Sequence, residues 1–193
     1  MARKIDSAKR IAILKAAREM FKERSYSATP VSEIAHKAGI ATGTFYLYFK
    51  SKLDVVDALC DYYLMDQIQY IAASVDERDI RLSISRGIHA ALVHASENAD
   101  LVRLIDLRRS HLGRNSRPPA DRNVQKMMRG WLSTFVSDGV MYPYNPRIMA
   151  ELITGLIEWI SKICFAWYDL DPHRYEDTVI ELLQRALIID YKG

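Results

Sequence analysis

The chain has 193 residues, of which 49% are hydrophobic and 26% are charged, and its formal net charge is +3. This length allows one sizeable core or a small domain joined to a larger one, and no apolar run approaches the ~20 residues of a membrane span. The N-terminus is basic but no apolar segment follows it, so we expect a cytoplasmic protein without a signal peptide.

The charge is unevenly distributed along the chain. Residues 1–55 contain eleven Lys/Arg and five Asp/Glu, a balance of +6, and the remaining residues balance at −3. A basic block of this kind indicates contact with a polyanion such as nucleic acid. An uneven but merely solvated surface would have the same balance, so charge alone does not decide.

Helical periodicity runs along almost the whole chain, and no segment shows the sustained alternation of a strand. The N-terminal third predicts helices over about 7–24, 30–37 and 42–49 and a longer one after Ser51. Asp6 or Ser7 can cap the first of these, and Ser51 can cap the fourth. Thr29 offers a capping hydroxyl to the second, with Pro30 in the first helical position.

The rest of the chain predicts five further helices, over about 79–97, 99–112, 120–138, 146–169 and 172–190. The segment 113–119 is rich in Gly, Arg and Pro and is predicted to be a loop. Asn145 can cap the helix that Pro146 opens. The fold class predicted from these patterns is all-α, with about nine helices.

Residues 34–46 have the spacing that a helix-turn-helix requires. Ala35 provides a small side chain where the two helices must cross closely. Gly39, four residues later, can adopt the positive φ of the turn without strain. Phe45 then fills the space between the helices. In this motif the second helix presents its N-terminal residues to the major groove of DNA.

The candidate DNA contacts lie on and beside this second helix. Hydroxyls and lysines can position the protein on phosphates, and threonine methyls can touch thymine. The helix has no Arg, Asn or Gln for a bidentate base contact, which favours readout by close fit and DNA shape. The predicted contacts are Ser32, Thr42, Gly43, Thr44, Tyr46, Tyr48, Lys50 and Lys52. The alternative is that the aromatic residues are only the core of a plain three-helix bundle.

These residues resemble the TetR family of bacterial transcriptional repressors. The segments 32–40 and 43–52 are close to the usual pattern of that family, with Tyr48 at a position where histidine is common. Ser32 stands where some members have a longer side chain. The resemblance implies that Thr42, Gly43, Thr44 and Tyr46 face DNA and that Lys52 anchors the DNA backbone.

The resemblance also implies a domain organisation. Residues 1–52 would form the helix-turn-helix DNA-binding domain, and residues 53–193 would form a larger helical domain that dimerises and binds a small ligand. The residues themselves favour a dimer, because the helices at 146–169 and 172–190 have apolar faces wider than the ~100° that one neighbour needs. Wholly internal core helices are the alternative. The predicted interface residues are Ile153, Leu156, Ile160, Ile163, Trp167, Val179, Leu183 and Leu187.

A ligand pocket is predicted among the larger helices, because bulky and polar residues gather there. Its predicted lining residues are Tyr63, Gln67, Tyr70, His89, Trp131, Phe135 and Trp159, each of which could instead belong to an ordinary core. The basic run is Arg103, Arg108, Arg109, His111, Arg114, Arg117 and Arg122. This run is either a solvated loop or a rim that attracts an acidic ligand, such as an acyl thioester of coenzyme A.

Together these patterns predict a ligand-responsive repressor that binds a palindromic DNA operator as a homodimer and needs no cofactor. No Ser-His-Asp arrangement, phosphate-binding glycine loop or metal-ligand spacing indicates an enzyme. Cys60 and Cys164 lie in apolar stretches and are expected to be buried, reduced thiols. The remaining alternative is a helical protein-interaction module, or a ligand-binding protein, without sequence-specific DNA binding.

Overall fold

The computed structural model describes residues 6–76, 78–111 and 119–189, and its regular elements there are all helical. They are α1 (Ser7–Arg24), α2 (Val31–Lys37), α3 (Thr42–Tyr48), α4 (Lys52–Ser74), α5 (Ile80–Glu97), α6 (Ala99–His111), α7 (Pro119–Ser137), α8 (Pro146–Ser161), the π-helix η1 (Lys162–Trp167) and α9 (His173–Leu187). The prediction of an all-α chain with nine α-helices is confirmed for these residues. The loop predicted at 113–119 lies outside them, except that α7 begins at Pro119.

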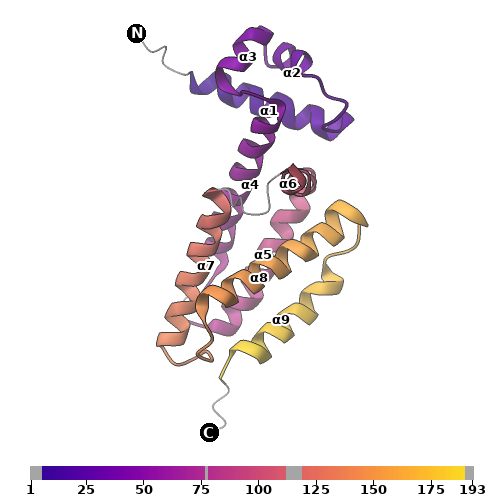
Figure 1. The fold of residues 1–193 in the computed structure, drawn as a ribbon. Coiled ribbons are helices and arrows are strands. Elements are labelled where there is room, and N and C mark those ends of the chain that lie inside the picture. The colour runs from indigo at the N-terminus through magenta and orange to yellow at the C-terminus, as the bar shows by residue number, and fades with distance from the viewer. Residues whose placement is uncertain (1–5, 77, 112–118, 190–193) are drawn as a thin grey trace.

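The helices form two groups joined by one long helix (Figure 1). Helices α1, α2 and α3 pack together at one end, and α4 leaves this group and runs into the bundle formed by α5–α9. Helix α4 contacts α5, α6 and α7 in the bundle and α1 in the N-terminal group. It is therefore a structural part of both groups.

Local capping explains where several helices begin. The Asp6 side chain accepts a hydrogen bond from the Ala8 N–H, and the Ser51 hydroxyl accepts one from the Asp54 N–H. Asn145 accepts bonds from the first two free N–H groups of α8. These side chains supply acceptors to N–H groups that have no partner within the helix, as the sequence predicted.

Thr29 does not cap α2, and that prediction was wrong. Its hydroxyl donates to the Ser25 carbonyl oxygen at 2.7 Å, and its side chain is fully buried beneath the end of α1. Helix α2 begins at Val31, after an extended Pro30. The threonine therefore stabilises the connection between α1 and α2 rather than the start of α2.

One continuous core links the two groups. It extends from Ile13 in α1 through Val55, Val56 and Leu59 in the first turns of α4 to Leu187 in α9. A short bridge between Met141 and Ile188 ties the connection before α8 to the end of α9. Within the described residues, no helix is both long and apolar enough to cross a membrane.

Candidate DNA-binding surface and ligand cavity

Helices α2 and α3 form the turn that the sequence spacing predicted. Gly39 has a φ of +70°, and its N–H donates to the His36 carbonyl at 3.0 Å. The Ile40 N–H donates to the Ala35 carbonyl at the same distance. Ala35 and Phe45 are fully buried between the helices. This geometry fixes α3 against α2 with its outer face free.

The outer face of α3 is formed by residues three and four positions apart. Gly43, Tyr46 and Leu47 follow this spacing and are all exposed, with 54% of Tyr46 and 63% of Leu47 accessible. Lys50 lies just after the end of α3 and is also exposed. A Cβ added at Gly43 would meet no atom within 4 Å. The packing of the protein itself therefore does not demand glycine there, whereas a close approach from outside would.

The other predicted contact residues lie around this face. Ser32 and Thr42 are exposed, and Thr44 and Tyr48 are half-buried at its margin. Leu47 is an addition that sequence reasoning missed. The sequence did indicate this position, because Leu47 stands four residues after Gly43 and next to Tyr46, which places it on the same face of the helix.

Lys52 has a different role from the predicted phosphate anchor, and that assignment is corrected. Its Nζ donates to the Tyr26 and Thr29 carbonyl oxygens at 2.5 and 2.7 Å and lies 4.3 Å from the centre of the Tyr26 ring. Burial lowers the pKa of Lys52. Its ammonium group thus holds the connection between α1 and α2 instead of facing the DNA side.

Two adjoining cavities lie in the bundle. The first, of about 100 Å³, is lined by residues of α4, α6, α7, α8 and η1. The second, of about 80 Å³, lies among α4, α5, α7, α8 and α9. They share three lining residues, Ile71, Met128 and Ile157. The two cavities are therefore neighbours with these three residues between them.

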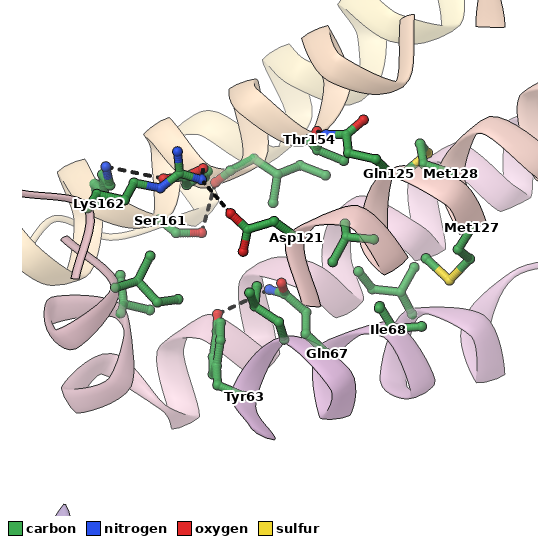
Figure 2. Close-up of a pocket in the computed structure, with 18 of the residues that line it drawn as sticks. Tyr63, Gln67, Ile68, Asp121, Gln125, Met127, Met128, Thr154, Ser161 and Lys162 are labelled. Carbon is green, nitrogen blue, oxygen red and sulfur yellow. Dashed lines mark hydrogen bonds and ion pairs between the residues drawn. The ribbon is translucent and has the colours of Figure 1, made fainter. Parts of the chain in front are cut away.

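The charged side chains of the first cavity gather towards one end (Figure 2). Lys162 lies at this end, and Asp121 and Tyr63 lie between it and the middle of the cavity. Met127 and Met128 lie at the other end, with the polar side chains of Gln125 and Thr154 beside Met128. The amide of Gln67 donates to the Tyr63 hydroxyl at 3.1 Å.

Arg108 is the centre of the charged end. Its side chain is 1% exposed, and its guanidinium bonds to Asp61 at 3.0 Å and to Asp121 at 2.9 Å. Its Nε has no acceptor among the described residues. Burial raises the pKa of Asp61, and the charge of Arg108 opposes this shift.

Two further cations complete the charged end. Arg109 pairs with Glu158 at 2.5 Å, and Lys162 pairs with Glu158 at 3.2 Å and with Asp106 at 3.1 Å. From the predicted basic run, only Arg108 and Arg109 line the cavity among the described residues, and Arg114 and Arg117 lie outside those residues. The predicted rim is thus a network of paired charges.

The predicted pocket residues fall into four groups. Tyr63 and Gln67 line the first cavity, and Trp131 and Phe135 line the second. Tyr70 and His89 line an open surface depression instead. Trp159 is 54% exposed and packs edge-on against Trp167 on the outside, so its assignment to the pocket was wrong. The polar cavity residues that sequence reasoning missed include Asp121, Gln125, Thr154 and Lys162.

The predicted dimer face needs a correction of side. Ile153, Ile160, Val179, Leu183 and Leu187 are at most 7% exposed because they pack in the core of this chain. Leu156 and Ile163 are half-buried, and Trp167 is 43% exposed. The apolar residues that α8 and α9 leave at the surface are Ile148, Leu152, Trp159 and Leu182.

Comparisons with known proteins agree with this architecture. The model of the family described as "Bacterial regulatory proteins, tetR family" matches residues 13–59. The "Uncharacterized HTH-type transcriptional regulator YvdT" of Bacillus subtilis is 42% identical over 183 residues, which cover 91% of this chain and 93% of that protein. The "Fatty acid metabolism regulator protein" of the same organism is 29% identical over 189 residues, 89% of this chain and 91% of that protein.

Solved structures share the fold. FadR from Bacillus subtilis in complex with stearoyl-CoA has a TM-score of 0.68 at 23% identity, over 90% of this chain and 96% of that one. The fatty acid degradation regulator FadR from Bacillus halodurans has a TM-score of 0.71 at 20% identity, over 91% and 94%. At these identities the likeness establishes the arrangement of helices.

Proposed function

The chain belongs to the TetR family of bacterial transcriptional regulators, and on that premise we propose that it is a cytoplasmic repressor released from its operator by a ligand. The operator is a palindrome, the repressor is a homodimer, and the ligand is small and largely apolar.

The observation that carries the proposal is the double role of α4. Its first turns bury Val55, Val56 and Leu59 against the core, next to the helix-turn-helix. Its later turns line the first cavity with Tyr63 and Gln67. A ligand that displaces α4 at the cavity therefore also displaces the domain that presents α3.

The DNA side of the proposal rests on the outer face of α3. Gly43 lets the backbone approach the groove, Tyr46 and Leu47 contact base edges and sugars, and Lys50 pairs with phosphate. Ser32, Thr42, Thr44 and Tyr48 add hydroxyl contacts at the margin. Non-specific attraction comes from the +6 balance of residues 1–55.

The dimer forms through the exposed apolar residues of α8 and α9. Ile148, Leu152 and Trp159 lie on one face of α8 at near-helical spacing, and Leu182 is exposed on α9, which lines the second cavity together with α8. Large apolar side chains that gather at the surface of two neighbouring helices favour a four-helix interface across a two-fold axis. Such a dimer would place two copies of α3 in successive major grooves, about 34 Å apart.

The ligand occupies the internal cavities, and its chemistry is suggested by the relatives. One curated relative is a fatty acid metabolism regulator, and one structural relative was solved with stearoyl-CoA. An acyl-CoA or similar acyl compound suits a space with one charged end and an apolar continuation. When it binds, ligand and operator antagonise each other to the same extent in both directions.

The test begins with genomic DNA fragments recovered on the purified protein, from which the common palindrome is identified. Binding to that duplex should weaken steeply as salt rises, because phosphate contacts release counterions. Added long-chain acyl-CoA should then release the DNA. A flat response to salt, or an effector that tightens operator binding, would overturn the proposal.

A further inference from the structure

We infer that the two cavities form a single site for an unbranched amphiphile, with its oxygen-bearing head at Arg108 and its hydrocarbon tail in the second cavity. This inference rests on the proposed function, because it names the class and the orientation of the effector. It assigns a separate task to each cavity. The shared chemistry of the head is a carbonyl or carboxylate oxygen, which fatty acids and acyl thioesters both have.

The head assignment follows from the polar groups of the first cavity. Arg108 lines that cavity while its buried Nε has no acceptor among the described residues. Other polar groups of the wall are already paired: Gln67 with Tyr63, and Gln125 with Thr154. A buried donor without an acceptor is costly, so a ligand oxygen placed there would remove an existing penalty.

The tail assignment follows from the composition of the second cavity. Except for Ser83 and Gly87, its lining residues are all apolar, and Trp131 and Phe135 form part of its wall. The Ser83 hydroxyl donates to the Asp76 carbonyl, so it is already committed. A wall with no polar group to offer favours hydrocarbon over any polar extension of a ligand.

One line of residues connects head and tail. Tyr63, Gln67 and Ile71 follow each other at four-residue intervals along α4, and Val75 follows directly after the last residue of the helix. Tyr63 and Gln67 line the first cavity, Ile71 lines both, and Val75 lines the second. At 1.5 Å per residue this line is about 18 Å long. It changes from polar to apolar in the direction away from the helix-turn-helix, as an extended acyl chain does from head to tail.

Gly87 offers a way to shorten this site. It lines the second cavity, and a Cβ added there would lie 3.8 Å from Ile71 and 3.9 Å from Val75, which is ordinary contact. Gly87→Leu should therefore fold, and its larger side chain should occupy the place of the tail. Gly130→Leu is the matched control, because Gly130 is an exposed helical glycine with open space around it.

The orientation is tested with brominated chains, because bromine quenches a nearby tryptophan. We expect 12-bromododecanoic acid, labelled at the tail, to quench Trp131 strongly, and 2-bromododecanoic acid, labelled at the head, to quench it little. Trp131→Phe should remove the difference. Equal quenching by the two acids, or a difference that persists in Trp131→Phe, would overturn the orientation.

The chain length and the head are tested by binding of octanoyl, dodecanoyl and hexadecanoyl chains, each as the free acid and as the CoA thioester, with dodecylamine for comparison. Gly87→Leu should weaken the preferred chain at least tenfold and shift the preference by about four carbons, the number that leucine adds, while Gly130→Leu behaves as wild type. Stronger binding of dodecylamine than of both dodecanoyl compounds would overturn the head assignment. An unchanged preference in Gly87→Leu would overturn the tail assignment.

Operator release separates this inference from the proposed function. If the acyl compounds bind with the expected quenching but the protein stays on the operator, the effector role fails and the site assignment stands. If another effector releases the protein from the operator and none of the acyl compounds binds, the site assignment fails and the repressor mechanism stands.

Discussion

Arg18 of α1 and Asp100 of α6 form a two-pronged ion pair between the helix-turn-helix group and the bundle. The Arg18 Nε donates to one oxygen of Asp100 at 2.7 Å, and its Nη2 donates to the other at 3.0 Å. Nη2 also donates to the Asn98 side chain. Because α6 contributes Val102 and Ile105 to the first cavity, this pair is a second connection, besides α4, between that cavity and the helix-turn-helix group.

Arg18→Gln is expected to lower the free energy of unfolding by about 1 kcal/mol at neutral pH, because the arginine is partly exposed and solvent screens the pair. Arg24→Gln, which removes an exposed pair with Glu33 inside the N-terminal group, should cost less. Arg18→Gln should also reduce effector-driven release of the operator several-fold, whereas Arg24→Gln should not. Equal behaviour of the two variants in urea unfolding and in DNA release would contradict this connection.

The pair should have a specific dependence on pH. Burial raises the pKa of Asp100, but the hydrogen bond and charge of Arg18 outweigh it and hold the pKa below its ordinary value. The stability that the pair contributes is therefore complete above the unfolded pKa of about 4 and is lost as pH falls through the folded pKa. Urea unfolding between pH 6 and 3 should show a smaller difference between wild type and Arg18→Gln at the acid end.

Lys52 and Lys50 are expected to act in opposite ways. Lys52→Met should lower the free energy of unfolding by about 1–3 kcal/mol, because two backbone carbonyls lose their donor. It should leave the salt dependence of DNA binding unchanged. Lys50→Met should leave stability unchanged and lower the slope of log affinity against log salt by about one. A reduced slope for Lys52→Met alone would restore it as the phosphate anchor.

Leu47 is expected to contribute to DNA recognition without contributing to stability. Because its side chain is largely exposed, Leu47→Ala should change the free energy of unfolding by less than ~0.5 kcal/mol. It should weaken operator binding about tenfold, if the leucine contacts a thymine methyl group. Ile11→Ala, an exposed apolar residue of α1, is the control and should bind DNA normally.

Replacing operator thymines with uracil removes only the methyl groups. At the position that Leu47 reads, this change should weaken binding of the wild type and have no further effect on Leu47→Ala. An equal loss for both proteins at every thymine would show that Leu47 reads none of them.

Local signals explain why so much of the fold was predictable. Asp6, Ser51 and Asn145 cap helices through neighbours two or three residues away, and the positive φ of Gly39 is a property of one residue. Contacts between distant residues have no such signature. Nothing in the residues around Lys52 indicates that its ammonium group meets the carbonyls of Tyr26 and Thr29.

The same limit explains the error in the dimer face. Helix α8 is apolar on two sides, so its periodicity predicted two neighbours but did not indicate which side each neighbour would cover. The tertiary structure turns Ile153 and Ile160 inward and leaves Leu152 and Trp159 outside. In the cavity, Arg108 could be read as a solvated cation because its partners, Asp61 and Asp121, lie on other helices.

The corrected dimer face can be tested by replacing exposed leucines of α8 and α9, and one buried leucine of α9, with a charged residue. Leu152→Glu and Leu182→Glu, at positions that are 60% and 56% exposed, should give folded monomers, because a charge there opposes only the association. Leu183→Glu, at a position that is 7% exposed, should cost more than ~4 kcal/mol and unfold the chain. Sedimentation and circular dichroism separate these outcomes, and a dimeric Leu152→Glu would refute the corrected face.

Arg108→Met is expected to destabilise the bundle in a way that acid relieves. The change leaves the carboxylates of Asp61 and Asp121 without their buried cation, which should cost about 3 kcal/mol at pH 7. Burial already raises the pKa of Asp61, and Arg108 lowers it, so the pKa should rise further in the variant. A carboxyl whose folded pKa exceeds its unfolded value of about 4 binds protons more tightly in the folded state. The loss of folding stability that it causes is therefore complete above the folded pKa and disappears as pH falls towards 4.

Urea unfolding should therefore show the stability deficit of Arg108→Met shrinking between pH 7 and pH 5. The added change Asp61→Asn should recover part of the stability at pH 7. A deficit that is independent of pH and unaffected by Asp61→Asn would mean that lost packing around the arginine, and not its charge, is responsible.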